Sequence, residues 1–542
     1  MKSENPKQYM MFNRDAQQKL VEGASLMYKA VCSTLSPKGR NVAIARQWGA
    51  PIVVHDGVTV ARDVKSDDKF VQIGINLVRE AATKTNEEAG DGTTTSTLIA
   101  YETIVRGMKL IQDGTNPMIL RKEIDDAIGQ ALKQLSVISK EAKTQEDLVK
   151  VATISSSDPE IGKLVGETVF KVGIDGLVSV EESGAYETTV DHSEGMGLDK
   201  GFTSPYFITS PNRMEAVISK PIIIITDREI TTQGEIVPII DYIITSDLEN
   251  NKNIVIIGNV GGQALQILVT NKLNGNINAC AIKAPGYGML ASGFLEDIAV
   301  LTGGKVIRKE LGLNLEEFAN QFDSSYLGHA EKVVADRKSS MIVRGFGDLD
   351  EVKGQIKKLK KQKREAKTLP ERENLDERIA KLSAGVSVVR VGAKTEIEGR
   401  EKVERVKDAV GAAQSALREG VVPGSGVTFL RIADAIKGDT DGARLMREVL
   451  EQPLRKVMEN SGEPNKVIKE YMGLIMDNKD IDYGYEVMSS KLTSMYNAGI
   501  IDPTKVIRLC LENGVSVATS ILTTDTLIDH VEPTTPGAPS GR

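Results

Sequence analysis

The spacing of apolar residues predicts that the first third of the chain is mainly helical. Between residues 16 and 32, Leu20, Ala24, Met27 and Val31 recur at intervals of 4, 3 and 4 residues, which places them on one face of a helix. Similar patterns predict helices over residues 70–85 and 94–110. Short apolar runs at residues 41–45 and 51–54 predict strands instead.

The middle of the chain has a different pattern. Continuous apolar runs at residues 221–226, 253–258 and 279–283 predict buried strands, and amphipathic stretches at 236–244 and 263–273 predict helices between them. Strands that alternate with helices usually form a parallel sheet covered on both faces. We therefore expect a separate α/β domain here.

A highly charged segment follows, between Asp348 and Leu382, and is predicted to be a helical hairpin with a break at Leu369-Pro370. Its apolar residues keep i, i+4, i+7 spacing and would form a narrow seam: Val352, Ile356, Leu359, Leu375, Ile379 and Leu382. The basic run from Lys357 to Arg364 resembles a nuclear signal or an RNA-binding patch, but the acids that follow favour a solvated helix face.

After about Arg400 the helical, glycine-punctuated pattern of the first third returns. We infer that the N- and C-terminal segments form one domain and that the α/β domain is inserted into it. A chain of 542 residues is too long for a single core. The sequence thus predicts a multidomain α+β protein. Its last residues, 531–542, are rich in Pro, Thr, Gly and Ser and are expected to be disordered.

Composition excludes several classes of protein. A net charge of −7 argues against a general nucleic-acid or membrane binder, and no apolar run is long enough to span a membrane. The three cysteines are too few and too widely spaced for a disulfide framework, and no two of the four histidines have metal-ligand spacing. The N-terminus lacks the apolar core of a signal peptide. We expect a cytoplasmic protein without a structural zinc or iron site.

The best candidate for chemistry is the loop Gly90-Asp91-Gly92-Thr93-Thr94-Thr95. Glycines let a backbone approach a phosphate closely, and the amides at a helix start offer donors to an anion. The Asp91 carboxylate would supply a hard oxygen for Mg²⁺. Taken alone, the same string also fits a capped turn before a helix. A Walker A motif is absent from the sequence, so this is not a P-loop ATPase.

Two other loops and four acids extend this candidate. Leu35–Arg40 fits either a phosphate loop or a surface turn, and Val422–Val427 allows either close approach to a flat ligand or a tight turn. Hydrolysis of a phosphoanhydride needs acids that bind metal and orient water. Asp56, Asp91, Asp408 and Asp502 are candidates, although their spacing in the sequence does not show that they converge.

Seven segments together resemble the group I chaperonins, the GroEL family, in order and approximate spacing from about Phe12 to Thr524. These segments are Thr34–Val42, Asp56–Ala61, Ala89–Thr95, Lys283–Gly288, Arg405–Ala409, Glu419–Gly426 and Asp502–Val506.

The resemblance implies a three-domain subunit. A discontinuous equatorial ATP-binding domain would comprise residues 1–137 and 419–526, an intermediate hinge domain 138–193 and 387–418, and an inserted apical polypeptide-binding domain 194–386, with a disordered tail at 527–542. It also implies an ATP-dependent chaperone that encapsulates unfolded proteins. The expected assembly is a homo-oligomer of seven-membered rings, usually two, with a GroES-type lid; the expected cofactors are ATP, Mg²⁺ and K⁺.

The resemblance also assigns roles to the candidate residues. Asp91 corresponds to the magnesium-binding acid, Asp408 to the acid that positions water, and Asp56 to a second acid near that water. The residues corresponding to nucleotide contacts are Gly92, Thr93, Thr94 and Thr95 at the phosphates; Thr34, Leu35, Ser36 and Pro37 in the second phosphate loop; His55 beside them; and Gly424, Ser425, Gly426, Glu486, Val487, Met488 and Asp502 at the adenosine.

For polypeptide binding, the family uses an apolar apical rim, because non-native proteins expose apolar surface. The corresponding residues are Phe202, Tyr206, Phe207, Val237, Ile240, Leu265, Val269 and Thr270. On helical spacing alone, ordinary helix burial is favoured for the residues between 237 and 270, and the resemblance reverses this preference.

The chain departs from the family pattern at several positions. Ser36 stands where the family usually has Gly, Ser425 interrupts a run of glycines, and His55 replaces a Lys. Glu486 lies in the base-contacting segment, and the Gly-Met tail is absent. These departures motivate a second hypothesis, a holding protein that has lost efficient ATP cycling. A metabolic kinase is disfavoured, because no phosphoacceptor-substrate motif accompanies the phosphate loops.

Overall fold

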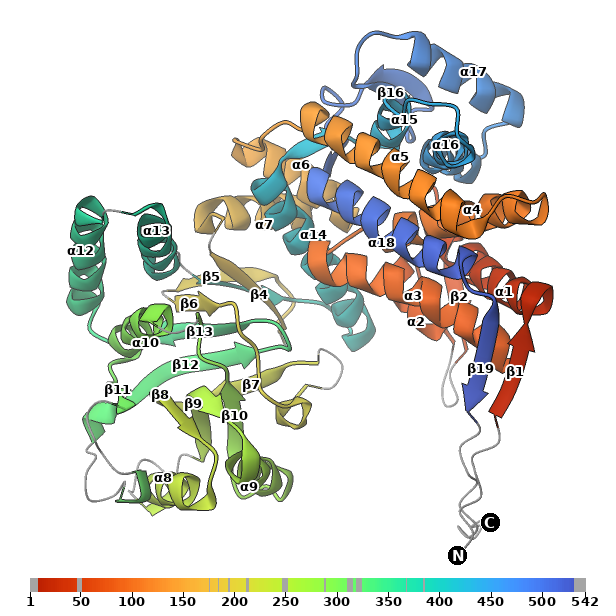
Figure 1. The fold of residues 1–542 in the computed structure, drawn as a ribbon. Helices are drawn as coiled ribbons and strands as arrows, with labels where there is room; N and C mark the ends of the chain where they lie inside the picture. The colour runs from red at the N-terminus through yellow and green to blue at the C-terminus, as the bar shows by residue number, and fades with distance from the viewer. Residues whose placement is uncertain are drawn as a thin grey trace, which may run out of the picture. The chain divides into compact units, whose positions relative to one another are not determined.

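The computed structural model describes residues 8–45, 51–174, 176–183, 185–193, 195–210, 214–245, 252–286, 289–309, 315–317, 324–366, 368–383 and 386–530. The chain forms two compact units (Figure 1), one from residues 1–170 and 404–542 and the other from residues 171–403. The first unit is therefore discontinuous in sequence, as the return of the helical pattern near Arg400 predicts. No described helix has the length and hydropathy to cross a membrane.

Long helices form most of the first unit. They are α1 (Asn13–Val31), α2 (Gly57–Asp63), α3 (Lys69–Ala89), α4 (Thr93–Gln112), α5 (Pro117–Ile138), α6 (Gln145–Ser156), α7 (Pro159–Val172), α14 (Glu396–Glu419), α15 (Val427–Ala433), α16 (Asp441–Asn460), α17 (Asn465–Asp477) and α18 (Thr504–Leu522). Helices α7 and α14 continue across the boundary between the units. The predicted face of α1 is confirmed, because Leu20, Ala24, Met27 and Val31 are all fully buried.

The core of the first unit joins distant parts of the sequence. Helix α18 packs against α3, α4 and α5, and α16 packs against α4 and α5. The short strands are β1 (Gln8–Phe12), β2 (Val42–Ile44), β3 (Ile52–Val54), β15 (Val421–Pro423), β16 (Tyr483–Glu486), β17 (Lys491–Ser494), β18 (Ile501–Pro503) and β19 (Thr526–His530). Strands β1 and β19 pair antiparallel, which brings the two ends of the described chain together (Figure 1).

The pairing of β1 with β19 corrects the predicted tail. Residues 527–530 were expected to be disordered, but they form most of β19, with Leu527 buried. Their backbone groups are satisfied by strand β1, which a reading of the C-terminal segment alone does not reveal. The remaining tail residues, 531–542, lie outside the described residues, as do residues 287–288 of the Lys283–Gly288 segment.

The second unit contains a larger sheet. Its strands are β4 (Leu177–Glu182), β5 (Thr189–Ser193), β6 (Gly195–Leu198), β7 (Ala216–Ser219), β8 (Ile222–Ile230), β9 (Asn253–Val260), β10 (Asn278–Ile282), β11 (Val306–Ile307), β12 (Leu327–Ala335), β13 (Ser340–Gly345) and β14 (Val386–Val391). Its helices are α8 (Gln233–Thr245), α9 (Gly262–Leu273), α10 (Met289–Thr302), α12 (Leu349–Glu365) and α13 (Leu369–Ser383). The main strand order is β10-β9-β8-β12-β13-β6, and β4, β14 and β5 form a separate sheet.

The main sheet is mixed rather than parallel throughout, which corrects the prediction. Strands β8, β9 and β10 are parallel, as expected, but β12 pairs antiparallel with both β8 and β13. The tight turn between β12 and β13 explains the antiparallel pairing of these two strands, since a short hairpin permits no other. The Asp336 carboxylate accepts hydrogen bonds from the backbone N–H groups of Lys338 and Ser339 in that turn.

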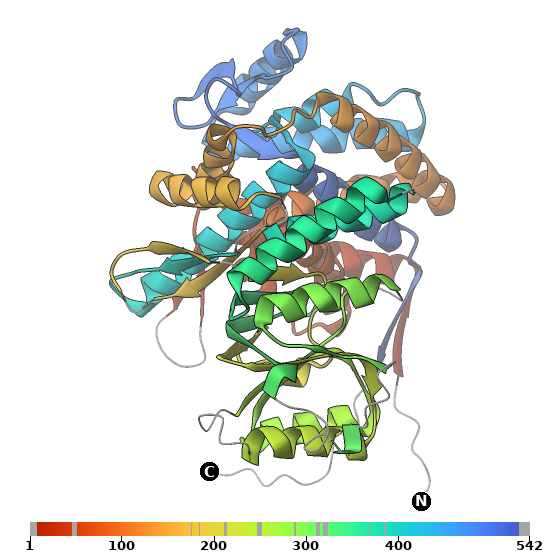
Figure 2. The same cartoon turned by 90° about the vertical axis from the view of Figure 1, so that its left-hand side faces the viewer.

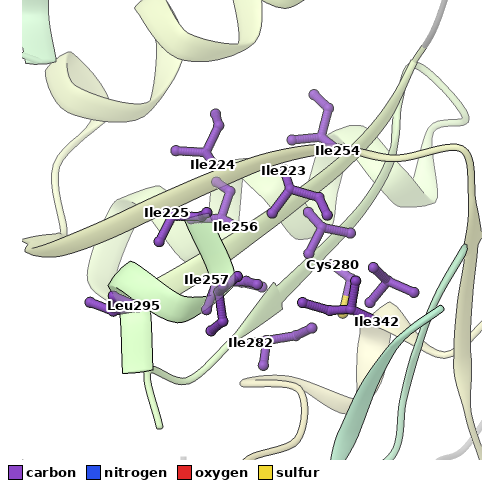
Figure 3. Close-up of a cluster of buried hydrophobic side chains, with 14 of the residues drawn as sticks. Ile223, Ile224, Ile225, Ile254, Ile256, Ile257, Cys280, Ile282, Leu295 and Ile342 are labelled. Carbon is purple, nitrogen blue, oxygen red and sulfur yellow. The ribbon is translucent and has the colours of Figure 1, made fainter. Parts of the chain in front are cut away.

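Figures 1 and 2 show α8 and α9 on one side of the parallel strands and α10, α12 and α13 on the other. Figure 3 shows the isoleucines between these layers, and Ile223, Ile225 and Ile257 are fully buried. The predicted helical hairpin is confirmed as α12 and α13, which pack on each other, but Leu369 and Pro370, the predicted break, are the first residues of α13. Leu359, Leu375 and Leu382 of its predicted seam are buried. The apolar runs thus end up in the core of this unit, as the sequence indicates.

Candidate functional site

The glycine-threonine loop joins the end of α3 to the start of α4. Gly90 and Gly92 have φ angles of 75° and 93°, values that side-chain-bearing residues rarely adopt. A Cβ on Gly92 would lie 2.7 Å from the Cys510 sulfur. Between them, Asp91 accepts a hydrogen bond from the Gly92 N–H at 2.5 Å. The Thr93 hydroxyl is buried and has no hydrogen-bond partner among the described residues. A helix start with an unpaired buried hydroxyl suits an anion.

Helix α2 brings Asp56 to this loop. The Asp56 carboxylate caps the helix, because it accepts hydrogen bonds from the N–H groups of Val58 at 2.9 Å and Thr59 at 2.8 Å. The next residue, Gly57, packs so closely on the loop that a Cβ there would lie 2.4 Å from the Thr94 hydroxyl oxygen. The contact therefore holds the capping acid beside the predicted phosphate-binding threonines.

Helix α14 brings Asp408 to the same loop. Gly411 lies against Gly90, and a Cβ on Gly90 would come within 2.5 Å of the Gly411 Cα. One turn further along α14, the Ser415 hydroxyl donates a hydrogen bond to the Ala89 carbonyl at 2.9 Å. Asp408 lies three residues before Gly411 and so shares its face of the helix. The backbone contact between two glycines thus sets the position of this acid.

Strand β18 supplies the fourth acid, Asp502. It pairs with Val422 of β15, and a Cβ on Gly424 would lie 3.1 Å from an Asp502 carboxylate oxygen. Ser425 and Gly426 follow in left-handed conformations, with φ angles of 59° and 79°. The Gly424–Gly426 segment and Asp502, both predicted on the adenosine side, are therefore neighbours in the structure.

Charge interactions link Asp56, Asp408 and Asp502 to Asp91, which agrees with the backbone contacts that place their segments around the loop. The pKa of Asp408 is raised well above its usual value by burial and then by the negative charges of Asp56 and Asp91. Burial, followed by the charge of Asp56, raises the pKa of Asp91. Burial raises the pKa of Asp502 to about 7, and Asp91 adds to the effect. Crowded carboxylates in a buried site favour a bound cation, which offsets their repulsion.

The donor set fits magnesium held together with a phosphate ligand. Among the residues that the structure describes, no group of three or more His, Cys, Asp or Glu side chains could hold a metal ion by itself. Mg²⁺ is usually bound by one or two carboxylates plus substrate phosphates and water. Asp91 can supply such a carboxylate beside the unpaired Thr93 hydroxyl at the start of α4.

The second predicted phosphate loop follows the short helix η1 (Cys32–Thr34). Ser36 adopts a φ angle of 78°, a left-handed conformation that Gly adopts more readily than a side-chain-bearing residue. Its hydroxyl is buried without a hydrogen-bond partner among the described residues, whereas the Thr34 hydroxyl donates to the Val31 carbonyl at 2.8 Å. Leu35 is half-buried and Pro37 is exposed. Ser36 is therefore the hydroxyl of this loop that is available to a ligand.

The remaining residues predicted to contact the nucleotide are exposed, buried in the core or hydrogen-bonded to other groups of the protein. His55 is exposed, and its Nδ1 lies 3.1 Å from the Asn41 side-chain oxygen. The Ser489 hydroxyl donates a hydrogen bond to the Glu486 carboxylate. Val487 lies in the core, and Met488 is 68% exposed. The Ser425 hydroxyl donates to the Tyr485 carbonyl at 2.7 Å, so it ties the glycine loop to β16.

The predicted polypeptide-binding residues divide into two groups. Phe202, Phe207 and Ile240 are buried, contrary to an exposed rim. Phe207 lies in the short helix η2 (Pro205–Phe207), which contacts α9 and β10, and Ile240 lies on the inward face of α8. Helix burial, the alternative that spacing allowed, therefore describes Ile240. Tyr206, Val237, Leu265, Val269 and Thr270 are exposed or partly exposed.

Sequence reasoning missed residues that position the site. Gly411 and Gly57 carry no chemistry, yet their lack of a side chain allows α14 and α2 to approach the loop. An isolated glycine within the helical pattern near Asp408 was the available signal. On the polypeptide side, Leu273 is 64% exposed and was not predicted. Its neighbour Lys272 donates hydrogen bonds to the Tyr206 and Ile208 carbonyls, so the end of α9 lies beside η2.

Comparison with known proteins agrees with this architecture. Residues 27–532 match the model of the TCP-1/cpn60 chaperonin family. The fold also matches the crystal structure of the chaperonin gp146 from the bacteriophage EL 2 (Pseudomonas aeruginosa) in the presence of ATP-BeFx. In crystal form II the TM-score is 0.73 at 20% identity, covering 96% of this chain and 99% of that one. In crystal form I the TM-score is 0.62 at 21% identity, with the same coverage.

A discontinuous helical unit with converging acids, and an inserted α/β unit, together define a chaperonin subunit. The chain belongs to the TCP-1/cpn60 chaperonin family, since the family model spans nearly all of it. Both the predicted GroEL-type resemblance and the predicted fold class are confirmed. The boundaries of the three predicted domains and the roles of the individual site residues stay predictions.

Proposed function

We propose that this chaperonin is an ATPase that binds non-native polypeptides and encloses them for folding in a ring. The observation that carries the proposal is the convergence of Asp56, Asp91, Asp408 and Asp502 on the loop between α3 and α4. These acids come from four distant segments, and a capped turn alone would not require them. The structure of gp146 with an ATP analogue supports nucleotide binding in a similar fold.

In this proposal, the loop residues Gly92 to Thr95 and Ser36 hold the phosphates through backbone amides and hydroxyl groups. Asp91 holds Mg²⁺, which would neutralise charge on the phosphates. The adenosine lies against the segment around Gly424 and Asp502, with Glu486 at the base. We include K⁺ as a further cation at the phosphates because the resemblance to the GroEL family implies it.

Asp408 orients the attacking water, with Asp56 nearby. The side chain is carried by a helix that packs on the phosphate loop through Gly411 and Ser415. A carboxylate in this position accepts a hydrogen bond from the water and directs its lone pair at the terminal phosphorus. Burial and the neighbouring acids raise the pKa of Asp408, and a bound cation would return it toward the ionised form.

The Asp408→Ala variant tests this assignment. We expect nucleotide affinity within a few-fold of wild type and a turnover number at least about 100-fold lower, the usual contribution of a positioned acid or base. Nucleotide binding and phosphate release should be measured separately. Glu404→Ala is a matched control, because Glu404 is an exposed acid one turn earlier on α14. Near-normal turnover in Asp408→Ala would show that another residue positions the water.

For clients, we propose that apolar side chains on η2, α8 and α9 bind unfolded chains. Tyr206 and Leu273 are 63% and 64% exposed and lie on neighbouring segments. Exposed apolar surface of this kind binds the apolar surface of non-native proteins. Replacing both residues with Ser should weaken the capture of a denatured enzyme without changing ATP turnover. Unchanged capture would exclude this surface.

We propose seven-membered rings, in one or two layers, in the cytoplasm, with a GroES-type lid as partner. Electron microscopy with ATP, with and without a lid protein, tests both the ring and the lid. ATP-dependent refolding of a denatured enzyme would eliminate the alternative of a holding protein. Protection from aggregation that is indifferent to ATP would favour that alternative.

A further inference from the structure

A cavity lies beside the loop that follows η1. Its volume is about 320 Å³, and it is lined by the C-terminal part of α1, by Ser33 and Arg40 on either side of the loop, and by the end of α16. None of its lining residues belongs to the sets predicted to bind nucleotide or polypeptide. All of them lie in the first unit. The nucleotide site therefore does not account for this cavity.

The cavity carries an excess of positive charge. Lys29, Arg40 and Lys456 line it, against one acid, Glu459. Lys456 is the most enclosed of these cations, with its side chain 20% exposed and its Nζ 3.7 Å from the Glu459 carboxylate. A local excess of two positive charges in a protein with a net charge of −7 is a specific feature. Such a cluster favours an anion that carries two or more negative charges.

A stacked pair of aromatic rings forms one wall of the cavity. Tyr28 lines it and stacks on Tyr101, with ring centroids 4.2 Å apart and an interplanar angle of 18°. The Lys456 Nζ lies 5.5 Å from the centroid of the Tyr28 ring. The volume is at the lower end of the range for ligand sites, about 300–1,000 Å³. It suits a compound of pyrophosphate size rather than a macromolecular segment.

One side chain connects the cavity to the loop. The Asn460 amide group donates hydrogen bonds to the Cys32 carbonyl at 3.0 Å and to the Leu35 carbonyl at 2.9 Å. Both of its N–H hydrogens are therefore used. Asn460 also lines the cavity, so an anion that accepts a hydrogen bond from it must displace one of these carbonyls. That displacement would loosen the segment that holds Ser36.

We propose that this basic cavity is a regulatory site for a small, multiply charged phosphate compound, whose binding weakens nucleotide binding at the neighbouring loop. Two effects act in the same direction. First, the anion competes for the Asn460 amide and so loosens the loop that holds Ser36. Second, its negative charge lies beside that loop and repels the phosphates of a nucleotide bound there. The binding of the anion stands on the cavity alone, whereas its effect on nucleotide rests on the proposed function.

Calorimetric titration of the full-length assembly with pyrophosphate, at saturating ADP, tests binding. We expect one saturable site per subunit that Lys456→Gln and Arg40→Gln each weaken by about 10-fold or more, the value of one charge-assisted hydrogen bond. Lys456→Arg should retain binding. Lys466→Gln is the matched control, because Lys466 is exposed on α17 and does not line the cavity.

Three outcomes would overturn the binding proposal. They are no saturable binding at saturating ADP, binding that both variants leave unchanged, and binding only to dissociated subunits, which would mean that a second copy of the chain covers the cavity. If ADP itself fails to bind, the proposed function fails, but the dependence of pyrophosphate binding on Lys456 can still be measured.

The regulatory effect has its own readout. Increasing pyrophosphate should raise the ATP concentration for half-maximal turnover several-fold and then reach a plateau, as a coupled second site requires. Direct competition at the nucleotide site would instead raise it without limit. The plateau should disappear in Lys456→Gln, whose turnover without pyrophosphate stays that of wild type. A linear rise, or a plateau that persists in this variant, would refute the coupling.

Discussion

At the scale of single residues, the site depends on positions without side chains as much as on its acids. Gly90 and Gly411 allow two backbones to touch, and this contact brings Asp408 to the loop of Asp91. Sequence comparison points to the acids because they carry chemistry. It gives no distances, so their convergence could not be derived from their spacing along the chain.

The Gly90→Ala variant should lose both stability and nucleotide affinity. A φ angle of 75° costs a side-chain-bearing residue about 1–2 kcal/mol, and the new Cβ would lie 2.5 Å from the Gly411 Cα. Urea unfolding and nucleotide binding would measure the two losses. Gly129→Ala is the control, since Gly129 lies within α5 and a Cβ there meets nothing within 4 Å. It should stabilise by about 0.5–1 kcal/mol. If the two substitutions changed stability and nucleotide affinity equally, the backbone conformation and close contact of Gly90 would not be the cause.

Asp502→Asn should stabilise the nucleotide-free protein at pH 8. The pKa of Asp502 is raised to about 7 from a usual value near 4, so the folded state binds this proton more tightly than the unfolded state does. Stability is therefore lost as pH rises from about 4 to 7. Removing the charge should recover about 1 kcal/mol or more at pH 8 and little at pH 4. Thermal unfolding at both pH values measures this, and a gain that is independent of pH would contradict it.

At the scale of elements, periodicity predicted α1, α3, α4, α8, α9, the hairpin of α12 and α13, and the three parallel strands, because each has a continuous or regularly spaced apolar pattern. It did not reveal the antiparallel strands β12 and β13. These depend on a four-residue turn held by Asp336 and on partners distant in sequence. The helical hairpin was predicted from the spacing of its apolar seam. The buried ion pair that anchors it joins α13 to Asp297 of α10, outside the hairpin, so the seam gave no sign of it.

This ion pair should dominate the stability of the hairpin. Asp297 of α10 is fully buried and accepts hydrogen bonds from Arg378 of α13 at 2.6 and 2.8 Å and from Gln355 of α12 at 2.8 Å. Arg378→Met leaves a buried charge unpaired, a change that typically costs about 3–5 kcal/mol. Hydrogen exchange in α12 and α13 should increase strongly as a result.

A second pair in the same hairpin provides the control. Unlike Asp297 and Arg378, which join α10 to α13, Lys363 and Asp376 join α12 to α13, and their side chains are 42% and 52% exposed. Lys363→Met should cost at most about 1 kcal/mol and leave hydrogen exchange in the hairpin nearly unchanged. If the two substitutions increased exchange equally, burial would not be the reason for the importance of Arg378.

At the scale of the whole molecule, the return of the helical pattern near Arg400 correctly predicted a discontinuous unit with another inserted into it. The two units differ in how their cores relate to the sequence. The large apolar core of the inserted unit draws only on residues between 196 and 382. The core of the other unit joins residues before 140 to residues after 420.

This difference predicts opposite behaviour of two fragments. Residues 171–403 should fold alone and unfold cooperatively, because every strand of the main sheet and the helices that cover it lie within the fragment. Residues 1–170 should not fold alone, because α4 and α5 would lose α16 and α18, on which their apolar faces pack, and exposed apolar faces do not sustain isolated helices. Circular dichroism and thermal unfolding of both fragments test this. Adding residues 404–542 in trans should restore structure to the N-terminal fragment. Independent folding of residues 1–170 would show that its core does not depend on the C-terminal helices.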